Sequence, residues 1–281
     1  MKNLENKVAV ITGAGSGIGR SLALKLHKKG VKLALNDFNE STLNGTIKLI
    51  GLKEEVYKEI FDVSNKDRFY QFANNVIKHY KKVDIVINNA GITNGNSSAS
   101  ETTIETYRKV FGVNLWGMIY GTLSFLPILR EQEESSVVNI SSIMGILGTP
   151  YQSVYSTSKF AIRGFSEAVA VEELCNNTGV TITSVHPGGI KTNIVRNIEG
   201  STLTDAQLKK MDAHFPTTAD KAADKIINAI QRKKTREVIG SDAKFMYFLS
   251  RLSHKLSMKF LVKWAKKLMS INGKKEVSSD K

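Results

Sequence analysis

The stretch TGAGSGIG, residues 12–19, follows a short apolar run, KVAVIT at residues 7–12, and leads into an amphipathic segment. Glycines let a backbone turn tightly and lie against a pyrophosphate, and the start of the next helix supplies N–H donors and a positive dipole end. Strand, glycine turn and helix in this order predict a dinucleotide-binding site. A flexible loop could have the same glycine-rich sequence, so the prediction depends on the strand before it and the helix after it.

Short apolar runs alternate with amphipathic stretches along the first 240 residues. The runs predict strands at residues 7–12, 31–36, 56–61, 84–88, 136–141, 180–186 and 237–240. The amphipathic stretches predict helices at residues 18–29, 43–52, 66–81, 103–130, 151–176 and 219–232. Strands that are apolar throughout belong to parallel sheets covered on both faces. We therefore expect a doubly wound, three-layer α/β fold in one domain, residues 1–241, with ligands beyond the carboxyl ends of the strands.

A carboxylate, Asp37, ends the second predicted strand about 20 residues after the glycine turn. At this spacing a carboxylate accepts hydrogen bonds from the adenosine ribose and repels a 2′-phosphate. Neither Ser16 nor Phe38 supplies a basic side chain that would neutralise such a phosphate. The sequence thus favours NAD over NADP, the alternative being that Asp37 is a solvated turn residue.

Further motifs follow the later strands: NNAG at residues 88–91, Asn114, Ser142, YSTSK at residues 155–159 and Pro187-Gly188. In this order and spacing they resemble the short-chain dehydrogenase/reductase family, with its TGxxxGxG and YxxxK patterns. The resemblance covers about residues 4–240. It implies a Rossmann-type fold and an oxidoreductase that moves hydride to or from a nicotinamide cofactor.

Tyr155 and Lys159 are four residues apart, so on a helix they share one face. A free phenol has a pKa of about 10 and is a poor base at neutral pH. A neighbouring ammonium and an oxidised nicotinamide both favour the phenolate, which would allow proton transfer near physiological pH. Without the other motifs, such a pair would be ordinary helix surface.

The resemblance assigns a role to each member of a catalytic set. Tyr155 would exchange the hydroxyl proton, and Ser142 would hydrogen-bond the substrate oxygen. Lys159 would hold the nicotinamide ribose and lower the pKa of Tyr155, while Asn114 would hold a water that links Lys159 to solvent. Ser142 is chosen over Ser141 because it lies thirteen residues before Tyr155. No metal site is expected, since the five histidines show no ligand spacing.

The resemblance also implies a set of cofactor contacts beyond the catalytic Tyr155 and Lys159. They are Gly13, Ser16, Gly17, Ile18, Gly19, Asp37, Phe38, Asp62, Val63, Asn89, Ala90, Gly91, Val113, Pro187, Gly188, Ile190 and Thr192. Two of them have a purely structural alternative, because Asp62 would also cap a helix and Pro187-Gly188 would also simply turn the chain.

An apolar substrate region is expected after the catalytic serine and between residues 190 and 215, where helical periodicity is lost. The substrate contacts would be Ser142, Ile143, Met144, Tyr155, Gly188 and Ile194. Such a lining predicts an NAD-dependent enzyme that interconverts a hydrophobic secondary alcohol and its ketone, or an alcohol and an aldehyde. The alternatives are packing of these side chains onto the protein body, an NADPH-dependent 3-oxoacyl-thioester reductase, and an NAD(H)-binding interaction module without turnover.

The basic charge is concentrated at the carboxyl end. The chain has 281 residues and a net charge of +14, and residues 232–281 hold fourteen Lys and Arg against four Asp and Glu. We expect residues 242–281 to form an extension with a basic amphipathic helical segment at 243–270 that bends or breaks before Lys263 and Lys267. It would be a flap over the cleft or a subunit partner, or a peripheral membrane contact. A nucleic-acid partner lacks any recognised motif.

Three further features concern assembly and compartment. Residues 110–129 carry no charge but include Asn114 and Pro127, which favours a buried helix at an internal or subunit interface over a membrane span. With the resemblance, this predicts a homodimer or homotetramer. The single Cys175 and the absence of a usual secretory signal in the first ten residues predict a cytoplasmic protein, with a membrane-peripheral one as the alternative.

Overall fold

The computed structural model describes residues 1–51, 56–192, 215 and 217–273. Seven parallel strands form one sheet in the order β3-β2-β1-β4-β5-β6-β9. Their bounds are β1 Val8–Thr12, β2 Lys32–Asp37, β3 Val56–Ile60, β4 Ile85–Asn88, β5 Ser135–Ile140, β6 Val180–Pro187 and β9 Arg236–Ile239. The predicted doubly wound α/β fold is therefore confirmed, with the strand order reversing between β1 and β4, where such folds bind ligands.

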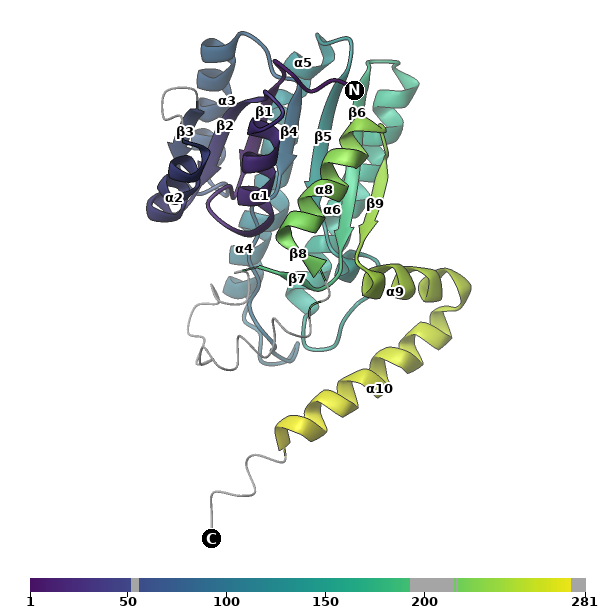
Figure 1. Ribbon diagram of the computed structural model, residues 1–281. Helices are drawn as coiled ribbons and strands as arrows, with labels where there is room; N and C mark the ends of the chain where they lie inside the picture. Colours follow the sequence, from purple (N-terminus) through teal and green to yellow (C-terminus); the bar gives the residue numbers. More distant parts are fainter. Residues whose placement is uncertain (52–55, 193–214, 216, 274–281) are drawn as a thin grey trace.

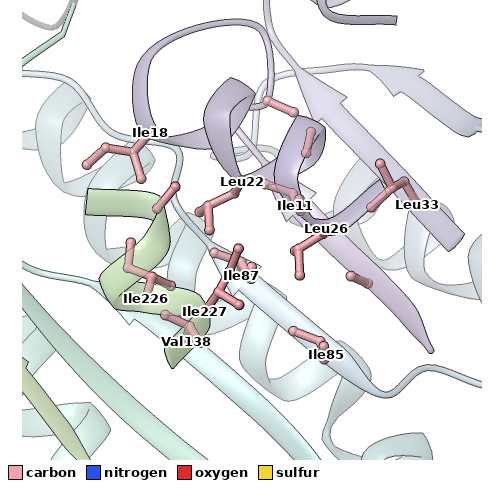
Figure 2. Close-up of a cluster of buried hydrophobic side chains, with 14 of the residues drawn as sticks. Ile11, Ile18, Leu22, Leu26, Leu33, Ile85, Ile87, Val138, Ile226 and Ile227 are labelled. Carbon is pink, nitrogen blue, oxygen red and sulfur yellow. The ribbon is translucent and has the colours of Figure 1, made fainter. Parts of the chain in front are cut away.

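Helices cover both faces of the sheet (Figure 1). On one face lie α1 (Gly17–His27), α2 (Glu40–Ile50) and α8 (Ala219–Gln231), and on the other lie α3 (Lys66–Tyr80), α5 (Gly117–Arg130) and α6 (Ser153–Cys175). Successive side chains of a strand point to opposite faces, so Ile11 of β1 joins one core and Val10 the other. Figure 2 shows the first core, where Leu22 of α1 and Ile226 of α8 lie close to Ile87 of the sheet.

The first residue of a helix is set by the capping residue before it more than by where the apolar periodicity begins. α2 begins at Glu40, three residues before the predicted start, because the side chain of Asn39 accepts the Thr42 N–H at 3.0 Å. Asn65 caps α3 in the same way through the Arg68 N–H at 3.1 Å. These asparagines place the ends of β2 and β3 next to helix starts, at the edge of the sheet where the site is expected.

The predicted helix at 103–130 consists of α4 (Ile104–Phe111), a π-helical turn η2 (Gly112–Trp116) and α5. In the described part of the chain, Ile104–Arg130 is the one helix long and apolar enough to cross a membrane by length and composition. However, α5 packs against α3 and the sheet, where Phe125 and Leu129 are fully buried. This agrees with the prediction of a buried helix, whereas Trp116 and Leu123 stay exposed on its outer side.

Two helices follow the last strand. α9 (Ser241–Leu252) packs against β9, and α10 (His254–Gly273) packs against α9 and extends away from the body (Figure 1). The backbone is extended at Ser253 (φ −160°, ψ 121°), so the helix breaks there. The sequence predicted a bend or break before Lys263, and the break lies ten residues earlier, at Ser253, while α10 runs through Lys263 without interruption.

Candidate active site

The glycine turn lies between β1 and α1 and requires glycine at two positions. Gly13 has a φ of +64°, which side chains rarely allow. A Cβ at Gly19 would lie 2.1 Å from the Gly13 carbonyl oxygen, so α1 can approach the turn this closely only without a side chain there. Ser16 is the N-cap of α1 and makes no capping hydrogen bond to the described residues. The first N–H groups of α1 are thus suited to bind a phosphate.

The carboxyl end of β4 is joined to this turn by hydrogen bonds. The Asn89 side chain donates to the Thr12 and Gly13 carbonyl oxygens at 2.9 and 3.1 Å. The Thr12 hydroxyl accepts the N–H groups of Asn89 and Ala90, both at 3.1 Å. The NNAG motif therefore fixes the shape of the glycine turn, in addition to any contact with a ligand.

Asp37 stands at the end of β2, directly against the turn. Its carboxylate accepts the Gly15 N–H at 2.8 Å and the Asn39 N–H at 2.9 Å, so it is held in place beside the turn. Phe38, the next residue, is 75% exposed and lies at the rim. Arg20 is close by, but its guanidinium donates to the Gly15 and Thr42 carbonyl oxygens and to the Thr46 hydroxyl.

The ends of β3 and of the π-helical turn form the next part of the site. Asp62 accepts the Ser64 N–H at 2.9 Å, and Asn65, not Asp62, caps α3. Val63 is buried so tightly against the helix that a Cβ at Gly117 would lie 2.7 Å from its Cγ2 atom. Val113 is partly buried one turn earlier, so the residues expected around adenine lie on adjoining elements.

Asn114 occupies the π-helical turn, a local geometry frequent at functional sites. It is buried, accepts the Ile92 N–H at 2.8 Å and donates to the Ile92 carbonyl oxygen at 3.0 Å. It also donates to the Ser158 hydroxyl at 3.0 Å. A Cβ at Gly91 would lie 3.3 Å from Asn114 Oδ1 and 3.5 Å from Lys159 Nζ. The structure thus brings Asn114, Gly91 and Lys159 together.

Helix α6 carries the other two members of the expected catalytic set. Its far half is fixed by ion pairs from Glu167 to Arg236 of β9 and from Glu173 to Arg130 of α5. Near the site, the Ser141 hydroxyl donates to the Lys159 carbonyl oxygen at 2.8 Å. Ser141 therefore holds the helix in place, which leaves the neighbouring Ser142 free for the role expected of it.

Ser142, Tyr155 and Lys159 form one cluster at the carboxyl end of β5. The Tyr155 hydroxyl lies close to the Ser142 side chain. Lys159 Nζ lies 5.4 Å from the centre of the Tyr155 ring and donates to the Ile140 carbonyl oxygen at 2.9 Å. Burial raises the pKa of Tyr155 to about 12, although the nearby Ser142 side chain lowers it, and burial lowers the pKa of Lys159 to about 7.

These directions differ from the sequence expectation of a lowered tyrosine pKa. The protein alone favours a neutral phenol and weakens the ammonium, because both groups are removed from water. The Lys159 ammonium also lies over the face of the Tyr155 ring. It therefore lowers the pKa of the hydroxyl less than an ammonium in direct contact with the hydroxyl oxygen would. A lowered tyrosine pKa would therefore need further positive charge near the hydroxyl.

The turn after β6 faces the glycine turn. A Cβ at Gly17 would lie 3.2 Å from Thr192 Cβ, so these two segments are in contact. Gly188 donates its N–H to Ile239 of β9 at 2.8 Å, directly after Pro187. The Ile190 side chain is buried in the core under α1, so only its backbone can meet a ligand.

The glycine turn, the NNAG segment, Asn114, Ser142 and the Tyr155–Lys159 pair thus meet at one edge of the sheet. The family model described as short chain dehydrogenase matches residues 7–202. A relative, the putative oxidoreductase SadH of Mycobacterium tuberculosis, is 40% identical over 260 residues, which cover 90% of this chain and 92% of the relative. The chain belongs to the short chain dehydrogenase family. It is an oxidoreductase of that family.

Solved structures of this family superpose on the chain. A short chain dehydrogenase/reductase from Burkholderia phymatum, in complex with NAD, gives a TM-score of 0.81 at 28% identity and covers 89% of this chain and 94% of its own. Levodione reductase gives 0.76 at 28% identity, covering 85% and 98%. An uncharacterized oxidoreductase of Bacillus subtilis, YxnA, is 29% identical over 94% of this chain and 73% of the relative.

The sequence did not reveal two residues that shape this site of the dehydrogenase. His186 of β6 is fully buried, with one ring nitrogen 3.1 Å from the Ser142 carbonyl oxygen and the other 2.9 Å from the Ser184 hydroxyl. Asp242 of α9 accepts the Gly189 N–H at 2.7 Å. The sequence contained one signal for His186, which lies at the end of a predicted strand. It contained none for Asp242, because Asp242 is 53 residues from Gly189.

His186 should make the stability of this dehydrogenase depend on pH. Burial lowers the pKa of His186 to about 4, while an unfolded histidine titrates near 6.5. Between these values the unfolded chain binds one more proton, so the free energy of unfolding should fall by about 3 kcal/mol from pH 7 to pH 4. Urea unfolding of wild type and His186→Asn at several pH values measures this. Parallel pH curves for the two proteins would contradict it.

The substrate side of the site is described in part. Ile143 and Met144, in the short 3-10 helix η3 (Ile143–Gly145), directly follow Ser142 and are half-buried. Gly188 lies next to Asp242, which would meet any Cβ added there at 2.3 Å. Ile194 and most of the expected apolar segment lie outside the described residues. The described residues on either side of that segment form two short parallel strands that pair with each other, β7 (Ile190–Lys191) and β8 (Thr217–Thr218).

Proposed function

We propose that this chain is an NAD-dependent dehydrogenase that interconverts a hydrophobic secondary alcohol and its ketone, or an alcohol and an aldehyde. The observation that carries the proposal is the cluster in which the Tyr155 hydroxyl lies close to the Ser142 side chain and Lys159 lies over the tyrosine ring, beside a glycine turn suited to a dinucleotide. The solved relative from Burkholderia phymatum, which is 28% identical, is described in complex with NAD.

Side chains of the protein would accept and transfer the hydroxyl proton of the substrate. In alcohol oxidation, Tyr155 would accept the hydroxyl proton and Ser142 would hydrogen-bond the same oxygen, stabilising the charge that develops there. A bound nicotinamide would supply the hydride acceptor and a positive charge. Lys159 would hold the nicotinamide ribose, and Asn114, whose side chain lies beside Gly91 and Lys159, would orient the route by which the proton reaches solvent.

In reduction the same groups work in reverse. The high pKa of Tyr155 in the protein alone keeps its proton on the phenol, which suits a general acid that protonates a carbonyl oxygen. For oxidation, the added positive charge of the cofactor would have to lower that pKa. The titration would then belong to the Tyr155–Lys159 pair and not to either residue alone.

An apolar substrate is supported by Ile143 and Met144, which follow Ser142 and are not fully covered by the protein. The test is a panel of lipophilic secondary alcohols, polyols and a 3-oxoacyl thioester, assayed by NADH absorbance with full-length protein. We expect turnover of the lipophilic alcohols. Activity on polyols alone, or a preference for the thioester with NADPH, would overturn the proposed substrate class.

Asp37 is expected to select NAD. Its carboxylate is fixed at the turn, and the Arg20 guanidinium already donates to three protein oxygens, so its N–H groups are less available to a 2′-phosphate. Asp37→Ser should raise the NADP to NAD ratio of kcat/KM by about a hundredfold, since charge-assisted hydrogen bonds to the ribose are lost and the repulsion ends. Glu40→Ser, an exposed carboxylate nearby, is the control. An unchanged ratio in Asp37→Ser would refute this role.

We further propose that the enzyme forms a homodimer or homotetramer through α5 and α6. Trp116, Leu123 and Phe160 are exposed on the outer sides of the helices that carry Asn114 and Lys159. Light scattering should show an oligomer for wild type and a smaller species for Leu123→Asp/Phe160→Asp. Leu49→Asp, exposed on α2 across the sheet, is the control and should assemble normally. A monomeric wild type would exclude this assembly.

A further inference from the structure

The outer side of α9 carries large apolar side chains. Phe245, Phe248 and Leu252 are 51%, 64% and 65% exposed. Their spacing of three and four residues puts them on one side of the helix. Ala243, on the opposite side of α9, is buried, and Leu249, at one edge of the stripe, is also buried against the protein, so the exposed stripe is not the side that packs on the protein.

The apolar stripe continues from α9 onto α10. The rings of Phe245 and Phe260 meet edge to face with centroids 5.7 Å apart. Leu256 lies one helical turn before Phe260, and both are more than 40% exposed. Phe245, Phe248, Leu252, Leu256 and Phe260 thus form one patch, which we name the apolar patch.

Cations accompany the apolar patch on the same two helices. Residues 243–275 contain nine Lys and Arg and no Asp or Glu. Lys244 and Arg251 are exposed beside the stripe on α9. On α10 a hollow is lined by Lys255, Met258, Lys259, Val262, Lys263 and Lys266. No described carboxylate forms a salt bridge with these lysines or with Arg251.

We propose that α9 and α10 bind the surface of an anionic lipid bilayer. Apolar side chains would enter the boundary between headgroups and acyl chains, and the lysines would meet the anionic headgroups. A second copy of the chain fits less well, because it would bring the same unpaired cations against each other. Nucleic acid would use the cations but not five exposed apolar side chains.

The contacts of α9 also indicate which end of the enzyme would face the bilayer. Asp242, at its start, binds the Gly189 N–H, and α9 packs against η3, which follows Ser142. The helices therefore leave the body at the edge of the sheet that holds the catalytic cluster (Figure 1). A bilayer bound there would present lipophilic substrates to that edge. This last step rests on the proposed function, whereas membrane binding itself does not.

The test is flotation of full-length protein with vesicles of phosphatidylcholine alone and with about one third phosphatidylglycerol. We expect at least a tenfold larger bound fraction on the anionic vesicles, falling steeply at high salt. Phe248→Ser/Leu252→Ser should lower the bound fraction at least fivefold. Lys255→Gln/Lys259→Gln should lower the salt concentration at which the protein leaves the vesicles. The matched controls are Leu49→Ser/Ile104→Ser and Lys28→Gln/Lys29→Gln, which alter exposed residues on the body and should float like wild type.

The following results of the binding experiments would overturn the proposal. Wild type that stays with the soluble fraction, or floats equally on neutral vesicles, excludes an anionic bilayer as partner. Self-association lost in Phe248→Ser/Leu252→Ser would assign the patch to a second copy, and retention on duplex DNA in place of vesicles would assign the cations to nucleic acid. Activity on the lipophilic secondary alcohols of the substrate panel is measured in parallel. Normal flotation without turnover would leave membrane binding standing and would refute only the proposed reaction.

Discussion

Tyr155→Phe should lower kcat by about a thousandfold or more while leaving NADH affinity close to that of wild type. Phenylalanine keeps the ring that Lys159 lies over, but it removes the hydroxyl that lies close to Ser142. Loss of a positioned general acid or base typically costs two to four orders of magnitude in rate. Steady-state NADH absorbance gives kcat, and NADH fluorescence titration gives the dissociation constant.

The control is Tyr70→Phe, which removes a hydroxyl from α3, outside the catalytic cluster, and should leave both quantities unchanged. Equal kcat values for Tyr155→Phe and wild type would remove the proposed mechanism and favour a protein that binds NAD(H) without turnover. Loss of NADH binding together with kcat would instead show that Tyr155 acts mainly in holding the cofactor.

The parts of the fold that sequence predicted well are those with a strong local pattern. Every predicted strand was found within a residue or two, because buried parallel strands such as β1 and β4 are apolar throughout. In such a sheet the carboxyl ends of the strands meet, so motifs that follow strands come together. For this reason the sequence alone places Asp37, Asn89 and Ser142 at one edge of the sheet.

What sequence missed depends on contacts between distant elements. The bond between His186 and Ser142 joins neighbouring strands, and the bond between Asp242 and Gly189 joins α9 to a turn more than fifty residues away. No local pattern encodes either contact. The pKa directions of Tyr155 and Lys159 in the protein alone likewise follow from burial by the whole site, which no local pattern encodes.

The carboxyl-terminal helices show how one local break changes a pattern. A single helical wheel over residues 243–270 places Leu249 on the same face as Phe245 and Leu252. The break at Ser253 divides the segment, and packing against the body buries Leu249 while Phe248 becomes exposed. The apolar patch is thus made by two helices, and its composition depends on how they pack against the body and against each other.

Gly19→Ala should damage both the fold and the cofactor site. The new Cβ would lie 2.1 Å from the Gly13 carbonyl oxygen and 2.6 Å from Asn89 Nδ2, so the turn or α1 must move. Overpacking of this kind costs about 3 kcal/mol of unfolding free energy. The displaced turn should also weaken NADH binding by about a hundredfold, since the phosphate-binding N–H groups move with it.

Gly164→Ala is the matched change elsewhere. Gly164 lies within α6, and a Cβ there would meet nothing within 4 Å, so alanine adds no clash. Alanine also restricts the unfolded chain and favours helix, which should raise the unfolding free energy by about 0.5–1 kcal/mol without affecting NADH. Urea unfolding and NADH titration of both variants give the comparison. If Gly19→Ala bound NADH as tightly as Gly164→Ala, the turn could not be the pyrophosphate site, because a binding loop cannot be displaced and keep its affinity.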